Sequence, residues 1–251
     1  MDKKDYQRFA HLSFEDFRRM ATDNELSPHE KIGFPDAYRE GKASRIFVDI
    51  LHKLAPLDAE NQTILDIGPG CSDLPLILIE HCKKHGHHLN LIDSAEMLAH
   101  LPDSSFISKW EAYYPACPEL FEQLSGQVNA ILCYSVFHYI FTESNIWRFI
   151  DHSLGLLAPG GQMLIGDIPN VSKRKRFFSS AAGIQYHRAF TGKDEVPHVQ
   201  FNIAEPDQID DAVVLAILQR ARTAGCDAYV LPQSPDLPMA NRREDILITK
   251  P

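Results

Sequence analysis

Acidic residues and glycines lie close together after an apolar run, and these residue types together can build a ligand-binding turn. The run Thr63–Leu65 leads into Asp66, and Gly68 and Gly70 follow with one residue between them. Glycine has no Cβ, so a backbone with two glycines can turn tightly and lie close to a ligand. Asp73 then opens an apolar segment as a helix N-cap residue. Strand, glycine turn and helix N-terminus in this order predict a nucleotide-type pocket.

The residue at the third position of the turn indicates which ligand the pocket takes. A dinucleotide-binding turn has a glycine or alanine there, whereas this chain has Asp73. A carboxylate at that place repels a pyrophosphate. S-adenosylmethionine (SAM) has no phosphate and carries a sulfonium and an ammonium group, so an acidic turn suits it better. We therefore predict that Asp66, Gly68, Gly70 and Asp73 bind SAM.

A further acidic residue ends the next apolar run. Asp93 follows Leu89–Ile92 and precedes Ser94, one strand–helix unit after the glycine turn. An α/β nucleotide site has at this place a carboxylate that accepts both ribose hydroxyls in a fork. We predict that Asp93 binds the ribose and that Ser94 belongs to the same cofactor site. The alternative is that Asp93 only caps the helix that follows it.

A later apolar run, 128–133, becomes polar at its end, where Tyr134, Ser135 and His138 follow. Side chains at the carboxyl end of a central strand face the crevice in which ligands bind. Tyr134 and Ser135 are expected beside the methionine part of SAM, and His138 is expected to reach the substrate. A comparable run ends at Asp167.

These residues meet at one edge of a sheet if strands and helices alternate, and beyond residue 60 they do. Apolar runs predict strands at 62–67, 88–93, 105–108, 128–134, 162–167, 227–231 and 245–250. Helical periodicity predicts helices at 73–85, 94–101, 143–157 and 207–224. The fold class is therefore α/β, with a doubly wound, mostly parallel seven-stranded sheet closed by a C-terminal antiparallel hairpin.

Two segments fall outside this alternation. Residues 1–59 are predicted to form an N-terminal helical cap, and residues 60–251 the SAM-binding domain. Within that domain, 170–205 mixes basic, aromatic and glycine residues without a clear period, so we predict an insertion that covers the substrate. Tyr38 and Arg39 of the cap and Tyr186 of the insertion are the expected substrate-binding residues.

Composition limits the functional classes. The net charge of -9 argues against general nucleic-acid binding, because a basic face supplies most of the affinity for nucleic acids. No apolar run can span a bilayer and no signal-peptide core follows Met1, so we expect a cytoplasmic protein that does not bind membranes. The five cysteines are scattered, which predicts reduced thiols and no zinc site. No feature of the sequence indicates an oligomeric state.

Four motifs occur in order: Asp66-Ile67-Gly68-Pro69-Gly70, Asp93, Cys133–His138 and Leu157-Ala158-Pro159-Gly160-Gly161. Together they resemble the class I, seven-stranded SAM-dependent methyltransferases, in particular the small-molecule branch. The resemblance implies that the residues after the third strand flank the adenine, which here means Lys109, Trp110 and Glu111. Trp110 can stack on the base, and the alternative is that it is a core tryptophan at the end of the strand. The segment Glu30–Pro35 has a weaker resemblance to methyltransferases of bacterial surface-sugar pathways.

An alcohol acceptor needs a base in addition to alignment with the methyl group. His138 is the first candidate base, His187 the second and Asp167 the third. We expect no metal, because Tyr134 stands where a catechol-type magnesium site has an aspartate. The histidines between residues 81 and 88 also match no standard zinc spacing.

The expected function is methyl transfer from SAM to an oxygen or nitrogen of a small polar acceptor, such as a sugar or a nucleotide-linked sugar, with S-adenosylhomocysteine (SAH) as product. The basic run Lys173–Arg176 would then hold a phosphate or carboxylate, although a solvated helix face is the simpler interpretation. Three alternatives stay open: an RNA methyltransferase, a catalytically silent SAM-binding partner subunit and a dehydrogenase. The acidic net charge disfavours the first, and Asp73 with the closing hairpin disfavours the last.

Overall fold

The structure, a computed structural model, describes residue 9 and residues 12–203 and 205–251. It contains one seven-stranded sheet in the order β3-β2-β1-β4-β5-β7-β6. The strands are β1 (Thr63–Ile67), β2 (His88–Asp93), β3 (Ile107–Glu111), β4 (Val128–Tyr134), β5 (Leu157–Pro169), β6 (Asp227–Pro232) and β7 (Arg243–Thr249). β7 runs antiparallel to β5 and β6, and the other neighbours are parallel. The predicted fold class, including the C-terminal hairpin, is confirmed.

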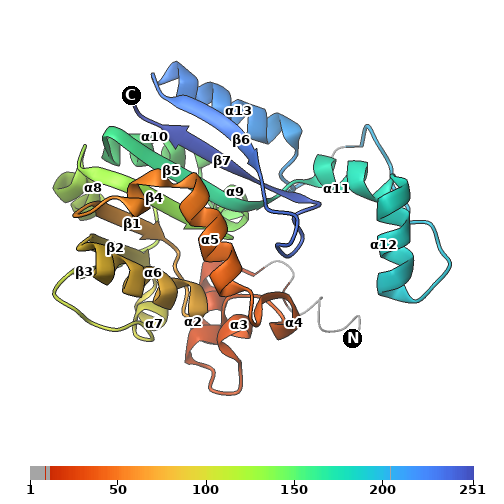
Figure 1. Cartoon of the computed structure of the whole chain (residues 1–251), viewed down its shortest axis with the longest axis horizontal. Coiled ribbons are helices and arrows are strands. Elements are labelled where there is room, and N and C mark those ends of the chain that lie inside the picture. The colour runs from red at the N-terminus through yellow and green to blue at the C-terminus, as the bar shows by residue number, and fades with distance from the viewer. Residues whose placement is uncertain (1–8, 10–11, 204) are drawn as a thin grey trace.

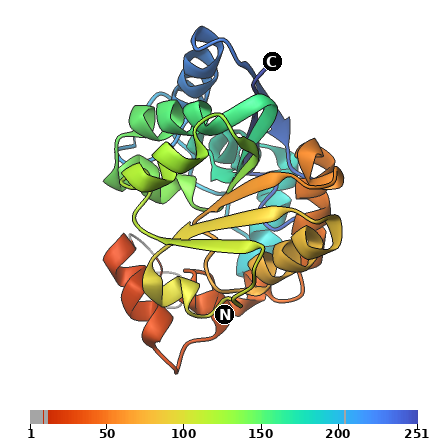
Figure 2. The same cartoon turned by 90° about the vertical axis from the view of Figure 1, so that its left-hand side faces the viewer.

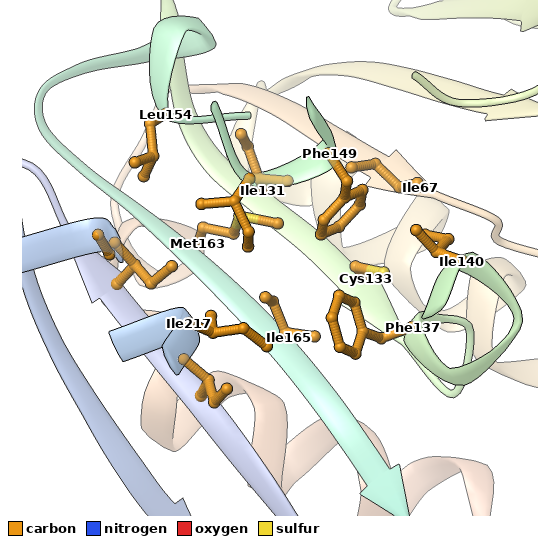
Figure 3. Packing of buried hydrophobic residues seen from close by; sticks show 14 of the residues in the cluster. Ile67, Ile131, Cys133, Phe137, Ile140, Phe149, Leu154, Met163, Ile165 and Ile217 are labelled. Carbon is orange, nitrogen blue, oxygen red and sulfur yellow. The ribbon is translucent and has the colours of Figure 1, made fainter. Parts of the chain in front are cut away.

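Helices cover both faces of the sheet, because successive strand residues are buried on opposite sides. Ile131 and Cys133 of β4 pack against residues of α8 (Pro118–Leu124), α9 (Phe137–Glu143), α10 (Ile146–Leu156) and α13 (Asp211–Thr223). Ala130 and Leu132 pack on the other face against residues of α5 (Ala43–Lys53), α6 (Asp73–His85) and α7 (Ala95–Leu98). Figure 3 shows Ile131 within the first cluster.

Two strand boundaries differ from the prediction by three residues or more. β3 covers Ile107–Glu111 rather than 105–108, because it pairs with β2 as far as Asp93. β5 begins at Leu157, whereas we expected Pro159-Gly160-Gly161 to precede the strand. Leu157 pairs with Val128 ahead of an irregularity in the ladder, so the glycines lie inside the strand.

The predicted helix 143–157 begins later in the structure, as α10, and a separate helix, α9, precedes it. α9 ends at Glu143, and α10 starts after Asn145. The Asn145 side chain accepts hydrogen bonds from the backbone N–H groups of Trp147 and Arg148 and so caps α10. The C-terminal helix is shorter than predicted, because α13 starts only after its N-cap Asp210.

The N-terminal helices α2 (Phe14–Thr22), α3 (Pro28–Lys31) and α4 (Asp36–Arg39) lie together at the lower end of the molecule (Figures 1 and 2). Ser13 and Ser27 start α2 and α3 with capping boxes. We use the name cap for residues 12–39. Residues 1–8 and 10–11 of the predicted cap lie outside the described residues. α5 instead packs with α6 and the sheet, joined by the 3-10 helix η1 (Ala55–Asp58), so packing is continuous across residue 60.

The segment after β5 forms a projection that we call the arm, residues 171–203. It contains α11 (Val171–Phe178) and α12 (Ala181–Thr191), and Figure 1 shows α12 standing away from the sheet. A Cβ at Gly183 would lie 1.9 Å from the carbonyl oxygen of Phe177, so the corner between the two helices requires a glycine. Across all described residues, no helix has the length and apolar character needed to cross a bilayer.

Candidate functional site

A cavity lies at the carboxyl ends of β1, β2 and β4, where the order of the strands reverses. Open α/β sheets bind their ligands at such a reversal. The space between its walls amounts to about 1080 Å³, open solvent included. The sheet side contributes the glycine turn and the ends of the three strands. The cap contributes the opposite wall through Phe14, Phe17, His29, Ile32, Phe34 and Arg39.

The glycine turn lines this cavity, and its backbone requires glycine. Gly68 and Gly70 have φ angles of 69° and 65°, in the left-handed region. A Cβ at Gly70 would lie 2.6 Å from Cγ2 of Ile32, and one at Gly68 would lie 2.7 Å from Cγ2 of Val136. The cap is therefore seated directly on the turn. Contact between these glycines and a ligand stays a prediction.

Two carboxyl groups lie beside the turn, Asp66, which is buried, and Asp93, which is half-buried. Asp93 lines the cavity and accepts hydrogen bonds from the backbone N–H groups of Gly70 (3.1 Å) and Ser94 (2.7 Å). Burial raises the pKa of Asp93 to about 6. Burial and the nearby Asp93 raise the pKa of Asp66 to about 8. Among the described residues no lysine, arginine or histidine forms an ion pair with either group. Such a site favours a ligand that brings a positive charge.

A second charged cluster lies against the ends of β4 and β5. Ser135 and Asp167 have φ angles of 63° and 60°, which non-glycine residues rarely adopt. Oδ2 of Asp167 accepts hydrogen bonds from Arg39 (2.6 Å), Arg243 (2.8 Å) and Ser135 (2.5 Å). Burial alone would raise the pKa of Asp167, but Arg243 and Arg39 hold it below its usual value. The network maintains the strained backbone at this edge.

His138, the first candidate base, lies beside this cluster and outside the cavity lining. Burial, with Arg243 and Arg39 nearby, lowers its pKa to about 3. Its Nδ1 is buried and has no hydrogen-bond partner among the described residues. The ring lies 3.8 Å from the ring of Tyr139. The imidazole is thus neutral and a weak proton acceptor at neutral pH.

His29 is a cavity histidine that the sequence analysis missed. It is buried, and its Nδ1 lies 3.0 Å from Oδ1 of Asp36. Its Nε2 lies 3.6 Å from Oδ2 of Asp73. A hydrogen bond from Ser27, together with His29, lowers the pKa of Asp36 despite some burial. His29 lies in a short helix without hydrophobic periodicity, so no local sequence pattern predicts that it lines the cavity.

The residues expected around adenine lie in β3, which extends to Glu111, and outside the cavity lining. Ala112 and Tyr113, which follow the strand, line the cavity. Trp110 Nε1 donates to Oδ1 of Asn90 at 3.1 Å, and Glu111 is exposed. Phe14 of the cap packs edge-on against Tyr113, with 4.9 Å between ring centroids.

The predicted site residues divide into two groups. Those that line the cavity are Arg39, Gly68, Gly70, Asp93, Tyr134 and Ser135. Those outside its lining are Tyr38, Asp66, Asp73, Ser94, Trp110, Glu111, His138, Asp167, Tyr186 and His187. Asp66 and Asp73 flank the turn, and the Ser94 hydroxyl caps α7 by accepting from the backbone of Met97.

Tyr186 and His187 lie on α12 of the arm, and no arm residue lines the cavity. The neighbouring basic run is held by partners within the chain. Lys175 pairs with Glu205 at 2.7 Å, Arg176 pairs with Asp211, and Lys173 Nζ donates to the carbonyl of Arg243 at 2.5 Å. These contacts leave the run less free to bind a phosphate.

One group of histidines is close enough to suggest a metal site outside the cavity. Potential ligand atoms of His81, His85 and His87 lie within 4.8 Å of one another. His87 Nδ1 accepts from the backbone of Gln62 at 3.1 Å, and its Nε2 lies 3.1 Å from the carbonyl oxygen of Leu57. Both nitrogens of His87 are thus engaged by the backbone, which does not fit a metal ligand.

No protein-family model matches the sequence. No curated protein matches it either. Solved structures do resemble it over almost the whole chain. The plantazolicin methyltransferase BamL, in complex with a triazolic desmethylPZN analog and SAH, shares 16% identity at a TM-score of 0.56, covering 94% of this chain and 96% of that one.

Two further structures show the same likeness. The N-methyltransferase NodS from Bradyrhizobium japonicum WM9, in complex with SAH, has 17% identity and a TM-score of 0.53, with 95% of this chain and 98% of that one covered. A SAM-dependent methyltransferase from Aquifex aeolicus has 15% identity and a TM-score of 0.52, with coverages of 89% and 98%. The sheet order, the C-terminal hairpin and these likenesses agree: the chain has the fold of the class I SAM-dependent methyltransferases.

Proposed function

We propose that this chain binds SAM at the carboxyl edge of its sheet and transfers the methyl group to an oxygen or nitrogen of a small polar acceptor. The observation that carries the proposal is the cavity at the strand-order reversal, with Asp93 in its wall, Asp66 behind it and no cationic side chain paired to either among the described residues. SAM brings a sulfonium and an ammonium group, so it would supply the positively charged partner that these carboxyl groups lack.

Different residues of the chain are proposed to bind different parts of SAM. The carboxylate of Asp93, already oriented by Gly70 and Ser94, accepts the ribose hydroxyls. Gly68 and Gly70 give the amino-acid part room at the turn. Tyr134 and Ser135 line the same space, while Asp73, Ser94, Trp110 and Glu111 are proposed to support it from outside the lining. SAM supplies an electrophilic methyl group when bound.

The cap would exclude water from the cavity and select the acceptor. Its aromatic residues form the wall opposite the glycine turn, and Phe17 packs edge-on against Tyr139 with 4.8 Å between centroids. An enclosed wall of this kind suits a small molecule better than a polymer. NodS is named an N-methyltransferase, which supports nitrogen as one of the two proposed acceptor atoms.

A sugar or a nucleotide-linked sugar is the acceptor class that we propose. Its support is the resemblance of Glu30–Pro35 to methyltransferases of bacterial surface-sugar pathways. Ile32 and Phe34 of this segment line the cavity, so the segment is in position to contact an acceptor.

His29 is the proposed base for a hydroxyl acceptor. It lines the cavity, and Asp36 orients its ring, which leaves Nε2 on the side of the glycine turn. Once an acceptor is known, His29→Gln should lower kcat and flatten its pH profile while leaving SAM affinity within about twofold. A pH profile unchanged by the substitution would reassign the role. His138→Gln is the matched variant that tests His138, the first candidate base from the sequence.

Calorimetry with SAM, SAH and NAD tests the cofactor, and a methyl-transfer screen with labelled SAM tests the acceptor. The screen should include sugar nucleotides, free sugars, amines and transfer RNA. We expect binding of SAM and SAH, no binding of NAD, and transfer to a small polar acceptor. Binding of NAD alone would contradict the proposal, and transfer only to RNA would replace the acceptor class.

A further inference from the structure

We propose that Arg39 is a carboxylate-binding residue of the cavity, a role that rests on the proposed function. Arg39 is only 7% exposed and lines the cavity from the cap. Its guanidinium lies over the ring of Phe34 at 4.0 Å from the centroid, and Phe34 lines the cavity too. The stacking fixes the plane of the guanidinium, which suits an arginine for planar recognition of a carboxylate.

The hydrogen-bond donors of Arg39 are only partly used. Nη2 donates to Oγ of Ser135 and to Oδ2 of Asp167, both at 2.6 Å. Nε is buried and has no hydrogen-bond partner among the described residues. A buried donor without an acceptor is costly, by about 1–3 kcal/mol in general. A ligand that brings an acceptor to Nε would remove that cost.

Asp167 also pairs with a second arginine besides Arg39. Arg39 and Arg243 both pair with Oδ2 of Asp167, at 2.6 Å and 2.8 Å. Within the described part of the chain, neither arginine has a second carboxylate at ion-pair distance. Burial and the neighbouring Arg39 lower the pKa of Arg243, as expected for excess positive charge. Asp245, which accepts from the backbone N–H of Asp167 at 2.8 Å, pairs with Lys53, so Asp167 is the only carboxylate that contacts the two arginines directly among the described residues. An added anion could therefore interact directly with Arg39, the arginine that lines the cavity.

The position of Arg39 matches the far end of a ligand whose ribose lies at Asp93. Asp93 ends β2, whereas Arg39 contacts Ser135 just beyond β4, and β1 with its glycine turn lies between them. Two strand spacings amount to about 10 Å. The cavity is thus acidic at one side of the turn and basic at the other. A carboxylate at the basic side comes either from the amino-acid end of SAM or from the acceptor.

Calorimetry with SAH and with 5′-methylthioadenosine distinguishes these sources, because 5′-methylthioadenosine lacks the amino-acid end. The variants are Arg39→Gln, and Arg39→Lys in case the first variant fails to fold. Arg243→Lys is the matched control, since it contacts the same carboxylate without lining the cavity. If Arg39 binds the carboxylate of the cofactor, its substitution weakens SAH by about 10- to 100-fold and leaves 5′-methylthioadenosine unchanged. The control keeps the wild-type ratio of the two affinities.

The second arm uses acetate as a probe on the SAH-bound protein. If both nucleosides keep their affinity ratio but acetate stabilises the wild type and not Arg39→Gln, the carboxylate belongs to the acceptor. If the ratio is unchanged and acetate acts equally on both proteins, Arg39 has only a structural role and the inference is wrong. A wild-type protein that binds neither nucleoside would instead contradict the proposed function.

Discussion

Asp66 is buried behind the glycine turn, and we expect its protonation to depend on the charge of the ligand in the cavity. Burial and Asp93 raise its pKa from an ordinary value near 3.8 to about 8. Folding therefore favours the protonated carboxyl group. The stability that this group contributes is greatest below about pH 4 and is lost as the pH rises toward 8, because the unfolded chain gives up the proton first.

Asp66→Asn should raise the melting temperature of the ligand-free protein, and by more at about pH 8.5 than at about pH 5.5, since asparagine cannot ionise. The same variant should bind SAM more weakly, because a cationic ligand gains from the ionised carboxylate. Thermal unfolding at both pH values and calorimetry check the two effects. Asp207→Asn, at an exposed aspartate, serves as the control. An equal rise at both pH values would argue against titration of Asp66.

Among the elements, we expect the cap to respond most directly to a ligand, because it forms one wall of the cavity. Ile32 rests on Gly70, Arg39 reaches Asp167, and Arg18 of α2 holds Glu96 at 2.7 Å. SAH should therefore slow backbone hydrogen exchange in α2, α3 and α4 as well as in the glycine turn. Exchange in α12 should stay unchanged, since the arm is remote from the cavity lining. Protection confined to the strands would show that the cap does not close over the ligand.

We expect that a substitution in the arm does not change the affinity for the cofactor. Tyr186 is 37% exposed on α12 and outside the cavity lining. Tyr186→Ser should leave the dissociation constant of SAH within about twofold, because surface substitutions usually change free energies by less than about 0.5 kcal/mol. Phe34→Ser, in the cavity wall, should weaken SAH clearly. If the arm covers the acceptor as the sequence predicts, Tyr186→Ser raises the KM of the acceptor alone.

How far the sequence predicts these elements depends on how local their causes are. α6, β2 and β4 have the predicted bounds, because each is an apolar run between glycine or polar residues. The end of β3 and the start of β5 were mispredicted, because both are set by pairing with a neighbouring strand. The cavity residues at the strand ends were predicted from the sequence, because each of them follows an apolar run. His29, Ile32 and Phe34 did not, since only the long-range packing of the cap on the turn brings them to the cavity.

At the scale of the whole molecule, the charged residues are distributed unevenly, but the basic run is paired with acidic residues close to it. The chain carries a net charge of -9, while its basic run lies on the arm. The ion pairs of that run with Glu205 and Asp211 neutralise much of its field. A polyanion would have to displace these pairs to bind, which supports a small acceptor over RNA.

The two core clusters cover opposite faces of one sheet, so the molecule should unfold as a single unit and report ligand binding in its melting temperature. SAH at about 100 times its dissociation constant adds about 2.7 kcal/mol. For a domain of this size that corresponds to a rise of about 5–10 °C. Asp93→Asn should show a smaller rise at the same SAH concentration, because it loses the proposed ribose contact, and NAD should give none. Calorimetric scanning of both proteins with each ligand checks this, and a rise with NAD equal to that with SAH would mean that the cavity does not select its ligand by charge.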